Sequence, residues 1–119
     1  MKKWLPNFKN IQMKTITAKE LKLRIDANEK LKLVNAMEEN KFRLKHIPGS
    51  LNLFRREDLE KNLTKDEAII VYCTDNACNK SLMLYQLLEA LGYKNVVRFA
   101  GGMYEWENEG YKLEGEMVN

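Results

Sequence analysis

The stretch from residue 68 to residue 92 holds a cysteine at a position suited to chemistry. The apolar run from Ala68 to Cys73 reads as a buried strand because it is rich in β-branched and aromatic residues. Residues 80–91 have helical spacing, and Gly92 is suited to end that helix. Cys73 therefore lies where a strand gives way, through a short polar loop, to a helix N-terminus. This is where α/β proteins bind ligands and place reactive groups.

A sulfur anion is favoured at such a position. The first turn of a helix has unpaired backbone N–H groups and partial positive charge, and a compact loop can aim further amides at one point. We therefore expect the pKa of the Cys73 thiol to fall and its sulfur to be nucleophilic at neutral pH. The alternative is an ordinary buried cysteine that ends a core strand. The order strand, cysteine, loop, helix favours the reactive thiol.

The polar loop carries two charges and a second cysteine. Lys80 lies near the helix start and should favour an anionic sulfur, whereas Asp75 should oppose it. Cys78 either shapes the loop or attacks a persulfide or sulfenic acid on Cys73 to form a disulfide. A loop that curls around Cys73 points its amides inward rather than its side chains. We therefore predict that Cys78 points away from the Cys73 sulfur and that the pair is reduced.

Composition excludes several classes of protein. The 119 residues suit one domain, and 45% of them are apolar and 31% charged. The net charge is only +3, and positive and negative residues are interleaved, which argues against nucleic-acid binding. Two cysteines and one histidine make neither a disulfide framework nor an obvious zinc site, so we expect no metal and no cofactor. No continuous apolar segment could span a membrane. We predict a cytoplasmic protein in a reducing compartment.

The remaining chain alternates between strand and helix patterns. Residues 1–12 read as an N-terminal extension, either a docked amphipathic helix or a loosely held tail, before a domain over residues 13–119. Strands are predicted at 13–17, 31–36, 51–53, 68–73 and 95–99, and helices at 18–27, 38–45, 57–63, 80–91 and 101–109. Pro48 and Gly49 suit the centre of a turn. The pattern predicts an α/β sandwich on a mainly parallel sheet of about five strands.

Five segments resemble the rhodanese-like domain in their order and spacing. They are Leu33–Met37, His46–Leu53, Val71–Cys73, Leu88–Tyr93 and Gly101–Trp106. The resemblance runs from about residue 14 to about residue 114, and it implies a three-layer sandwich with helices flanking the sheet.

The resemblance also implies a single-domain sulfurtransferase that uses thiosulfate or another sulfane donor. Cys73 matches the family's nucleophile, which becomes a persulfide. Cyanide, another thiol or an acceptor protein then takes the outer sulfur. We expect neither nucleic acid nor a membrane as a binding partner. The substrate-binding loop would comprise Thr74, Asp75, Asn76, Ala77, Cys78, Asn79, Lys80 and Ser81.

The sequence departs from the family pattern at several positions. The family often has Asp and then Arg after its second strand, where this chain has Asn35 and Met37, so an ion-pair partner is lost. The common loop has six residues and often ends in Arg, whereas Lys80 lies seven residues after Cys73.

His46 is predicted to be structural, because a histidine near a helix end commonly bonds to backbone carbonyls. Trp106 is predicted to belong to the core.

Three other functions compete with sulfur transfer. A binding module that has lost catalysis is favoured by Asn35, Met37 and Asp75 but opposed by the retained Cys73. A thiol–disulfide redox element would use Cys73 and Cys78. A phosphatase or arsenate reductase of the Cys-x5-Arg type fits poorly, because no Arg follows Cys73 in the loop and Asp75 would repel a dianion.

Overall fold

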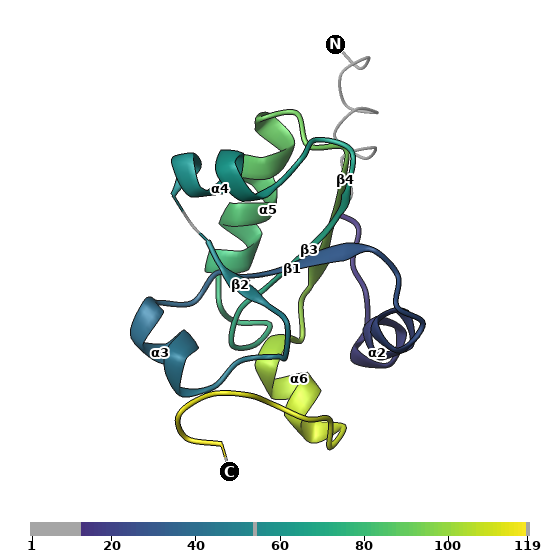
Figure 1. The fold of residues 1–119 in the computed structure, drawn as a ribbon, viewed down its shortest axis with the longest axis vertical. Helices are drawn as coiled ribbons and strands as arrows, with labels where there is room; N and C mark the ends of the chain where they lie inside the picture. The colour runs from purple at the N-terminus through teal and green to yellow at the C-terminus, as the bar shows by residue number, and fades with distance from the viewer. Residues whose placement is uncertain (1–12, 54, 119) are drawn as a thin grey trace.

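The computed structural model describes residues 13–53 and 55–118, so the predicted extension over residues 1–12 lies outside the described residues. Strands and helices alternate along the chain, as Figure 1 shows. In order, the elements are α2 (Ala18–Asp26), β1 (Leu31–Asn35), α3 (Glu39–Leu44), β2 (Leu51–Asn52), α4 (Arg56–Asn62), β3 (Ala68–Tyr72), α5 (Lys80–Ala90), β4 (Asn95–Phe99) and α6 (Gly102–Asn108).

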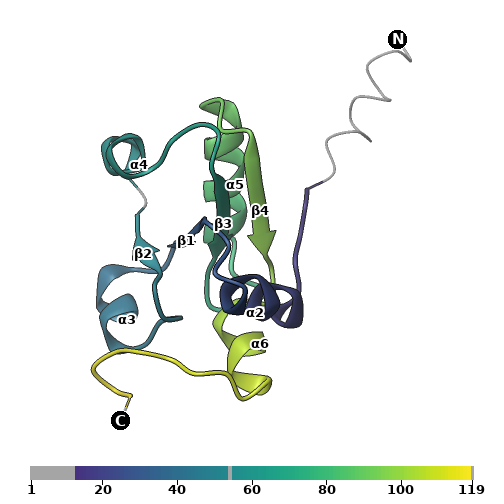
Figure 2. The same cartoon turned by 45° about the vertical axis from the view of Figure 1, so that its right-hand side comes forward.

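The four strands form one parallel sheet in the order β2-β1-β3-β4. Successive side chains of a strand point to opposite faces, and β3 follows this rule with its buried residues. Ile69 and Val71 pack with α4 and α5, whereas Ile70 and Tyr72 pack with α2 and α6. The two helix pairs therefore cover opposite faces of the sheet. In Figure 2, α4 and α5 lie in the upper part of the view and α2 and α6 in the lower part. This arrangement confirms the predicted three-layer α/β sandwich.

The predicted strand at 13–17 is much weaker than expected. It is reduced to one isolated parallel bridge between Thr15 and Arg98, beside β4. The N–H of Arg98 donates to the Lys14 carbonyl at 2.8 Å, and the N–H of Ile16 donates to the Arg98 carbonyl at 3.1 Å. Because helix α2 starts at Ala18, the segment leaves the sheet before a ladder can form. Among the described residues the sheet therefore has four strands rather than about five.

Local signals set the boundaries of several elements. Thr17 caps α2 in a capping box with Glu20, an arrangement typical of a threonine followed three residues later by a glutamate. Gly92 ends the 80–90 helix with a φ of 92°, a value that favours glycine. The turn before β2 is closed by a hydrogen bond from the Ser50 N–H to the Ile47 carbonyl at 3.1 Å. Gly49 occupies its third position with a φ of 82°, so the predicted turn is confirmed.

His46 and Trp106 both have structural roles. The Nδ1 of His46 lies 2.7 Å from the Phe42 carbonyl oxygen at the end of α3, and the two rings stack with their centroids 4.0 Å apart. Trp106 is buried, and its Nε1–H donates to the Lys112 carbonyl at 2.8 Å. Both contacts confirm the prediction that these side chains stabilise the fold.

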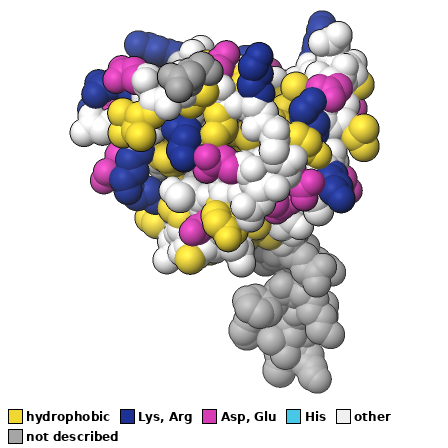
Figure 3. Space-filling model, turned by 90° about the horizontal axis from the view of Figure 1, so that it is seen from below, with side chains coloured by type: hydrophobic (Ala, Val, Ile, Leu, Met, Phe, Trp, Pro, Cys, Tyr) yellow, Lys and Arg dark blue, Asp and Glu magenta, His cyan; other side chains and the backbone are white. Residues whose placement is uncertain are grey.

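The surface shown in Figure 3 carries positive and negative side chains interspersed among apolar ones. Within residues 13–53 and 55–118, no helix is long and apolar enough to cross a membrane. In the same residues, no group of three or more His, Cys, Asp or Glu side chains is placed to hold a metal ion.

Candidate active site

Cys73 follows the last residue of β3, at the carboxyl edge of the sheet, and is only 2% exposed. Helix α6 holds the backbone at this point. The N–H of Met103 donates to the Cys73 carbonyl at 3.0 Å, and the N–H of Tyr104 donates to the Thr74 carbonyl at 2.8 Å. A Cβ on Gly102 would collide with both of these carbonyl oxygens. The Gly101–Gly102 segment therefore lets α6 approach the loop closely enough to anchor it.

The anchoring also orients the loop amides. In a trans peptide the N–H points opposite to the C=O, so the N–H groups of Thr74 and Asp75 point away from α6. Several backbone N–H groups at the loop and the start of α5 donate to no other described residue. They belong to Thr74, Asp75, Asn76, Asn79, Lys80, Ser81 and Leu82. This end of the sheet therefore has the unpaired donors that an anion site needs.

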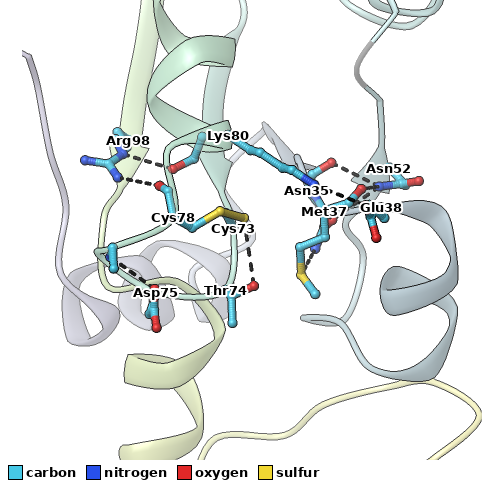
Figure 4. The surroundings of a disulfide bond; sticks show 12 residues. Asn35, Met37, Glu38, Asn52, Cys73, Thr74, Asp75, Cys78, Lys80 and Arg98 are labelled. Atoms are coloured by element: carbon cyan, nitrogen blue, oxygen red, sulfur yellow. Dashed lines mark hydrogen bonds and ion pairs between the residues drawn. A yellow bond between two sulfur atoms is a disulfide. The ribbon is translucent and has the colours of Figure 1, made fainter.

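Cys73 is joined to Cys78 by a disulfide bond, drawn in Figure 4. The prediction that Cys78 points away from the Cys73 sulfur and that the pair is reduced is therefore wrong. The Cα atoms lie 6.3 Å apart, within the range that a disulfide spans. Cys78 is half-buried, so it is the more exposed of the two cysteine residues.

A tight turn explains why the two side chains meet. The N–H of Cys78 donates to the Asp75 carbonyl at 3.1 Å, which folds the chain back on itself. The Asp75 carboxylate accepts a second hydrogen bond, from the Ala77 N–H at 3.0 Å. Asp75 thus shapes the turn, a typical role of aspartate near a bend. The sequence argument considered its charge but not this acceptor role.

Arg98 of β4 supports the loop from below, although sequence reasoning missed it. Its side chain is buried, with Nε donating to the Ser81 hydroxyl at 2.9 Å and Nη2 donating to the Cys78 carbonyl at 3.3 Å. The structure records no carboxylate of a described residue within ion-pair distance of this guanidinium. The signal in the sequence was a single cation, Arg98, among the apolar residues Val96, Val97 and Phe99.

Lys80 extends from the start of α5 toward the loop after β1, as Figure 4 shows. Its Nζ lies 3.6 Å from a carboxylate oxygen of Glu38, and both side chains are at least half exposed. An apolar groove of about 440 Å³ begins at these two residues. It is lined by Ala36, Met37, Glu38, Lys80, Met83, Leu84 and Leu87. The predicted cation is thus near the loop but is partly neutralised.

Asn35 and Met37 form a neutral network where the family often has charges. The Asn35 side-chain oxygen accepts from the Met37 N–H at 2.8 Å, and its amide lies 3.2 Å from the Met37 sulfur. Asn52 donates from the neighbouring strand to the Met37 carbonyl at 2.8 Å. Asn35 is completely buried, so this amide stabilises the backbone turn after β1 without an ion pair.

Tyr72 ties β3 to the turn before β2. Its hydroxyl accepts from the Ile47 N–H at 3.0 Å and lies 2.9 Å from the Ser50 hydroxyl. Burial raises the pKa of Tyr72 above its usual value, so the hydroxyl stays protonated at neutral pH. The residue before Cys73 is therefore held at both its backbone and its side chain.

The predicted loop residues from Thr74 to Ser81 thus come together around Cys73, with Ser81 buried beneath the loop and most of the others exposed. Fold and site define a parallel α/β domain with a cysteine loop at the carboxyl end of its central strand. The family model of the rhodanese-like domain matches residues 17–109. The chain belongs to the family of rhodanese-like domains.

One curated relative is "Putative sulfurtransferase YtwF" of Bacillus subtilis (strain 168), which is 29% identical over 101 residues. The match covers 83% of this chain and 95% of the relative. The similarity therefore extends over nearly the full length of this relative.

Two solved structures illustrate the similarity of fold. The BH2092 protein from Bacillus halodurans has a TM-score of 0.81 at 25% identity, covering 96% of this chain and 85% of that one. A rhodanese-like domain protein from Staphylococcus aureus has a TM-score of 0.69 at 28% identity, covering 87% of this chain and 99% of that one.

Proposed function

We propose that the protein is a rhodanese-type sulfurtransferase that carries sulfane sulfur as a persulfide on Cys73. With thiosulfate as donor, the Cys73 thiolate attacks the outer sulfur, the S–S bond of thiosulfate breaks, and sulfite leaves with the bonding electron pair. Cyanide or an acceptor thiol, on a small molecule or a protein, then attacks the outer sulfur and returns the Cys73 thiolate. The thiolate must first be freed from Cys78, which suits a reducing compartment such as the cytoplasm.

The position of Cys73 is the observation that carries this proposal. The cysteine sits where unpaired backbone N–H groups and the start of α5 supply positive potential. The Arg98 guanidinium lies against the same loop without a carboxylate partner among the described residues. It supplies from β4 a cation that the family often places at the end of the loop. Together these groups favour a thiolate or persulfide anion.

Intact mass spectrometry tests the proposal directly. Reduced and desalted protein is incubated with thiosulfate, and the Cys78→Ser variant is run beside it so that the thiol of Cys73 stays available. A gain of about 32 Da that cyanide removes as thiocyanate is expected for a persulfide. A Cys78→Ser protein that gains no mass from thiosulfate or any other sulfane donor would favour a binding module that has lost catalysis.

The disulfide favours a second candidate, a thiol–disulfide redox element made by Cys73 and Cys78. The two functions share one nucleophile. They differ in whether a sulfane sulfur is carried between donor and acceptor.

Charge at the loop should tune the use of anionic donors. Lys80→Ala is expected to lower kcat/KM for thiosulfate several-fold, because exposed charge pairs are worth about 1 kcal/mol or less. Asp75→Asn is expected to raise it by a similar factor, since the new amide oxygen can still accept from the Ala77 N–H while the negative charge is lost. Steady-state kinetics at low and high salt measure both effects, which should shrink as salt rises.

Lys94→Ala is the matched control for the loss of a lysine. Lys94 is 73% exposed, precedes β4 at the opposite edge of the sheet and pairs with Asp66. It should leave kcat/KM for thiosulfate unaltered. Equal losses in the two lysine variants, or unchanged thiosulfate kinetics in Asp75→Asn, would show that local loop charge does not govern donor use.

A further inference from the structure

The disulfide shows that the sulfur of Cys78 can reach the sulfur of Cys73 within the folded domain. The contacts that bring them together do not involve either sulfur. The Asp75 turn sets the backbone between the cysteines, α6 anchors the Cys73 and Thr74 carbonyls, and Arg98 holds the Cys78 carbonyl. Reduction of the disulfide leaves all of these bonds in place. The two sulfurs therefore remain neighbours when Cys73 is a thiol or a persulfide.

We propose that Cys78 is a resolving thiol that reduces the Cys73 persulfide and releases its outer sulfur as hydrosulfide. This inference rests on the sulfurtransferase function proposed above. It adds a reaction in which sulfane sulfur leaves as sulfide rather than passing to an acceptor. A disulfide between Cys73 and Cys78 is then the protein product of one such turnover.

The step is balanced in atoms and electrons. The Cys78 thiolate attacks the Sγ of Cys73, a new Sγ–Sγ bond forms, and the bond between Sγ and the outer sulfur breaks. The outer sulfur leaves with that electron pair and takes the proton that the Cys78 thiol gave up on forming its thiolate, so that it departs as hydrosulfide. Over loading and release together, the thiols of Cys73 and Cys78 are oxidised to a disulfide while one sulfane sulfur of the donor is reduced to sulfide. A dithiol reductant of the thioredoxin class then supplies two electrons to restore both thiols.

The charges around the loop favour this direction. The Arg98 guanidinium donates to the Cys78 carbonyl at 3.3 Å, so a cation lies close to the attacking residue and favours its thiolate. Hydrosulfide is the anion of a more acidic group than an alkyl thiol, and a less basic thiolate leaves faster. Attack at Sγ with loss of hydrosulfide is therefore a favourable route to the disulfide.

Exposure also sets the direction of the return step. Cys73 is 2% exposed in the disulfide, whereas Cys78 is half-buried. An incoming dithiol therefore attacks the sulfur of Cys78, the more exposed residue, and releases Cys73 as the leaving thiolate. That thiolate is the one beside the unpaired N–H groups, so the better leaving group is the one released.

A single-turnover experiment without reductant tests the inference. Reduced, desalted protein is mixed with one equivalent of thiosulfate in the absence of oxygen, hydrosulfide is trapped with monobromobimane, and remaining thiols are alkylated before intact mass analysis. Wild type is expected to release one hydrosulfide per chain and to end about 2 Da lighter than the dithiol form, with no thiol left to alkylate.

Variants at the two cysteines separate the steps. Cys78→Ser and Cys78→Ala are both expected to keep a cyanide-labile gain of about 32 Da and to release hydrosulfide at least about tenfold more slowly than wild type. Cys73→Ser should neither load nor release sulfur. The alanine variant repeats the test if serine disturbs the loop.

Three outcomes discriminate between the hypotheses. A wild-type protein that keeps its persulfide as long as Cys78→Ser does would overturn the resolving role and leave sulfur transfer intact. Failure of both Cys78 variants to load sulfur would instead overturn the proposed function. A disulfide that forms equally fast without thiosulfate would mean that direct oxidation makes the bond, and it too would refute the resolving role.

Discussion

Cys73→Ser is expected to abolish both the cyanide-labile sulfur and thiocyanate production, with kcat/KM falling by about 10³-fold or more. A serine hydroxyl is not ionised at neutral pH, and its oxygen cannot carry a sulfane sulfur as a persulfide does. The loop that surrounds it should persist, because its anchors are backbone carbonyls and Arg98 rather than the Cys73 sulfur. Cyanide-dependent kinetics with thiosulfate measure the loss.

Cys78→Ser is the matched variant for this measurement because it also removes the disulfide. It is expected to keep most of the cyanide-dependent transfer, since cyanide takes the outer sulfur from Cys73 without a second thiol. Thermal unfolding under reducing conditions checks that both serine variants are folded. Unchanged transfer by Cys73→Ser would refute the assignment of the nucleophile.

Gly102→Ala is expected to destabilise the domain by about 2–4 kcal/mol and to lower sulfur transfer as well. Gly102 has a φ of 57°, and an added Cβ would collide with the backbone oxygens of Cys73 and Thr74. Neither backbone oxygen can rotate away as a side chain could. Either α6 or the cysteine loop must therefore move, which weakens the hydrogen bonds from Met103 and Tyr104.

Gly110→Ala isolates the contribution of the clash. Gly110 also has a positive φ, 78°, but a Cβ there would have nothing within 4 Å. It should cost only the backbone strain of about 1 kcal/mol. Denaturant unfolding should therefore separate the variants by about 1–3 kcal/mol, and only Gly102→Ala should slow sulfur transfer. Equal destabilisation with equal activity would contradict the close approach of α6 to the loop.

The sequence determined the layer architecture and the position of the nucleophile. Short apolar runs marked β1, β3 and β4, and the parallel sheet follows because successive strands are connected through helices. The turn at Pro48–Gly49 depends on neighbours in the chain, so a short-range pattern predicted it. The capping box at Thr17 is equally local. The location of Cys73 after β3 required only the order of elements.

Tertiary structure alone decided the role of Cys78 and the source of positive charge at the loop. The expectation that the loop would point its amides, and not its side chains, toward Cys73 was wrong for Cys78. The turn at Asp75 reverses the chain and directs the Cys78 side chain toward Cys73 as well. Arg98 reaches the loop from β4, 20 residues after Cys78, so no local spacing could assign it. Its placement depends on the register of β4 beside β3, in which Val71 lies opposite Arg98.

The short segment before α2 also shows what a local sequence pattern cannot predict, because here a predicted strand does not form. Residues 13–17 have a strand-like pattern, yet only the Thr15–Arg98 bridge forms. A pattern records which residues suit a strand, whereas ladder length depends on how long two segments stay adjacent in space. Local chemistry therefore determined which elements exist and where the reactive cysteine lies. Contacts between distant segments decided what surrounds that cysteine, because burial, hydrogen bonding and sulfur proximity arise only when the segments pack together.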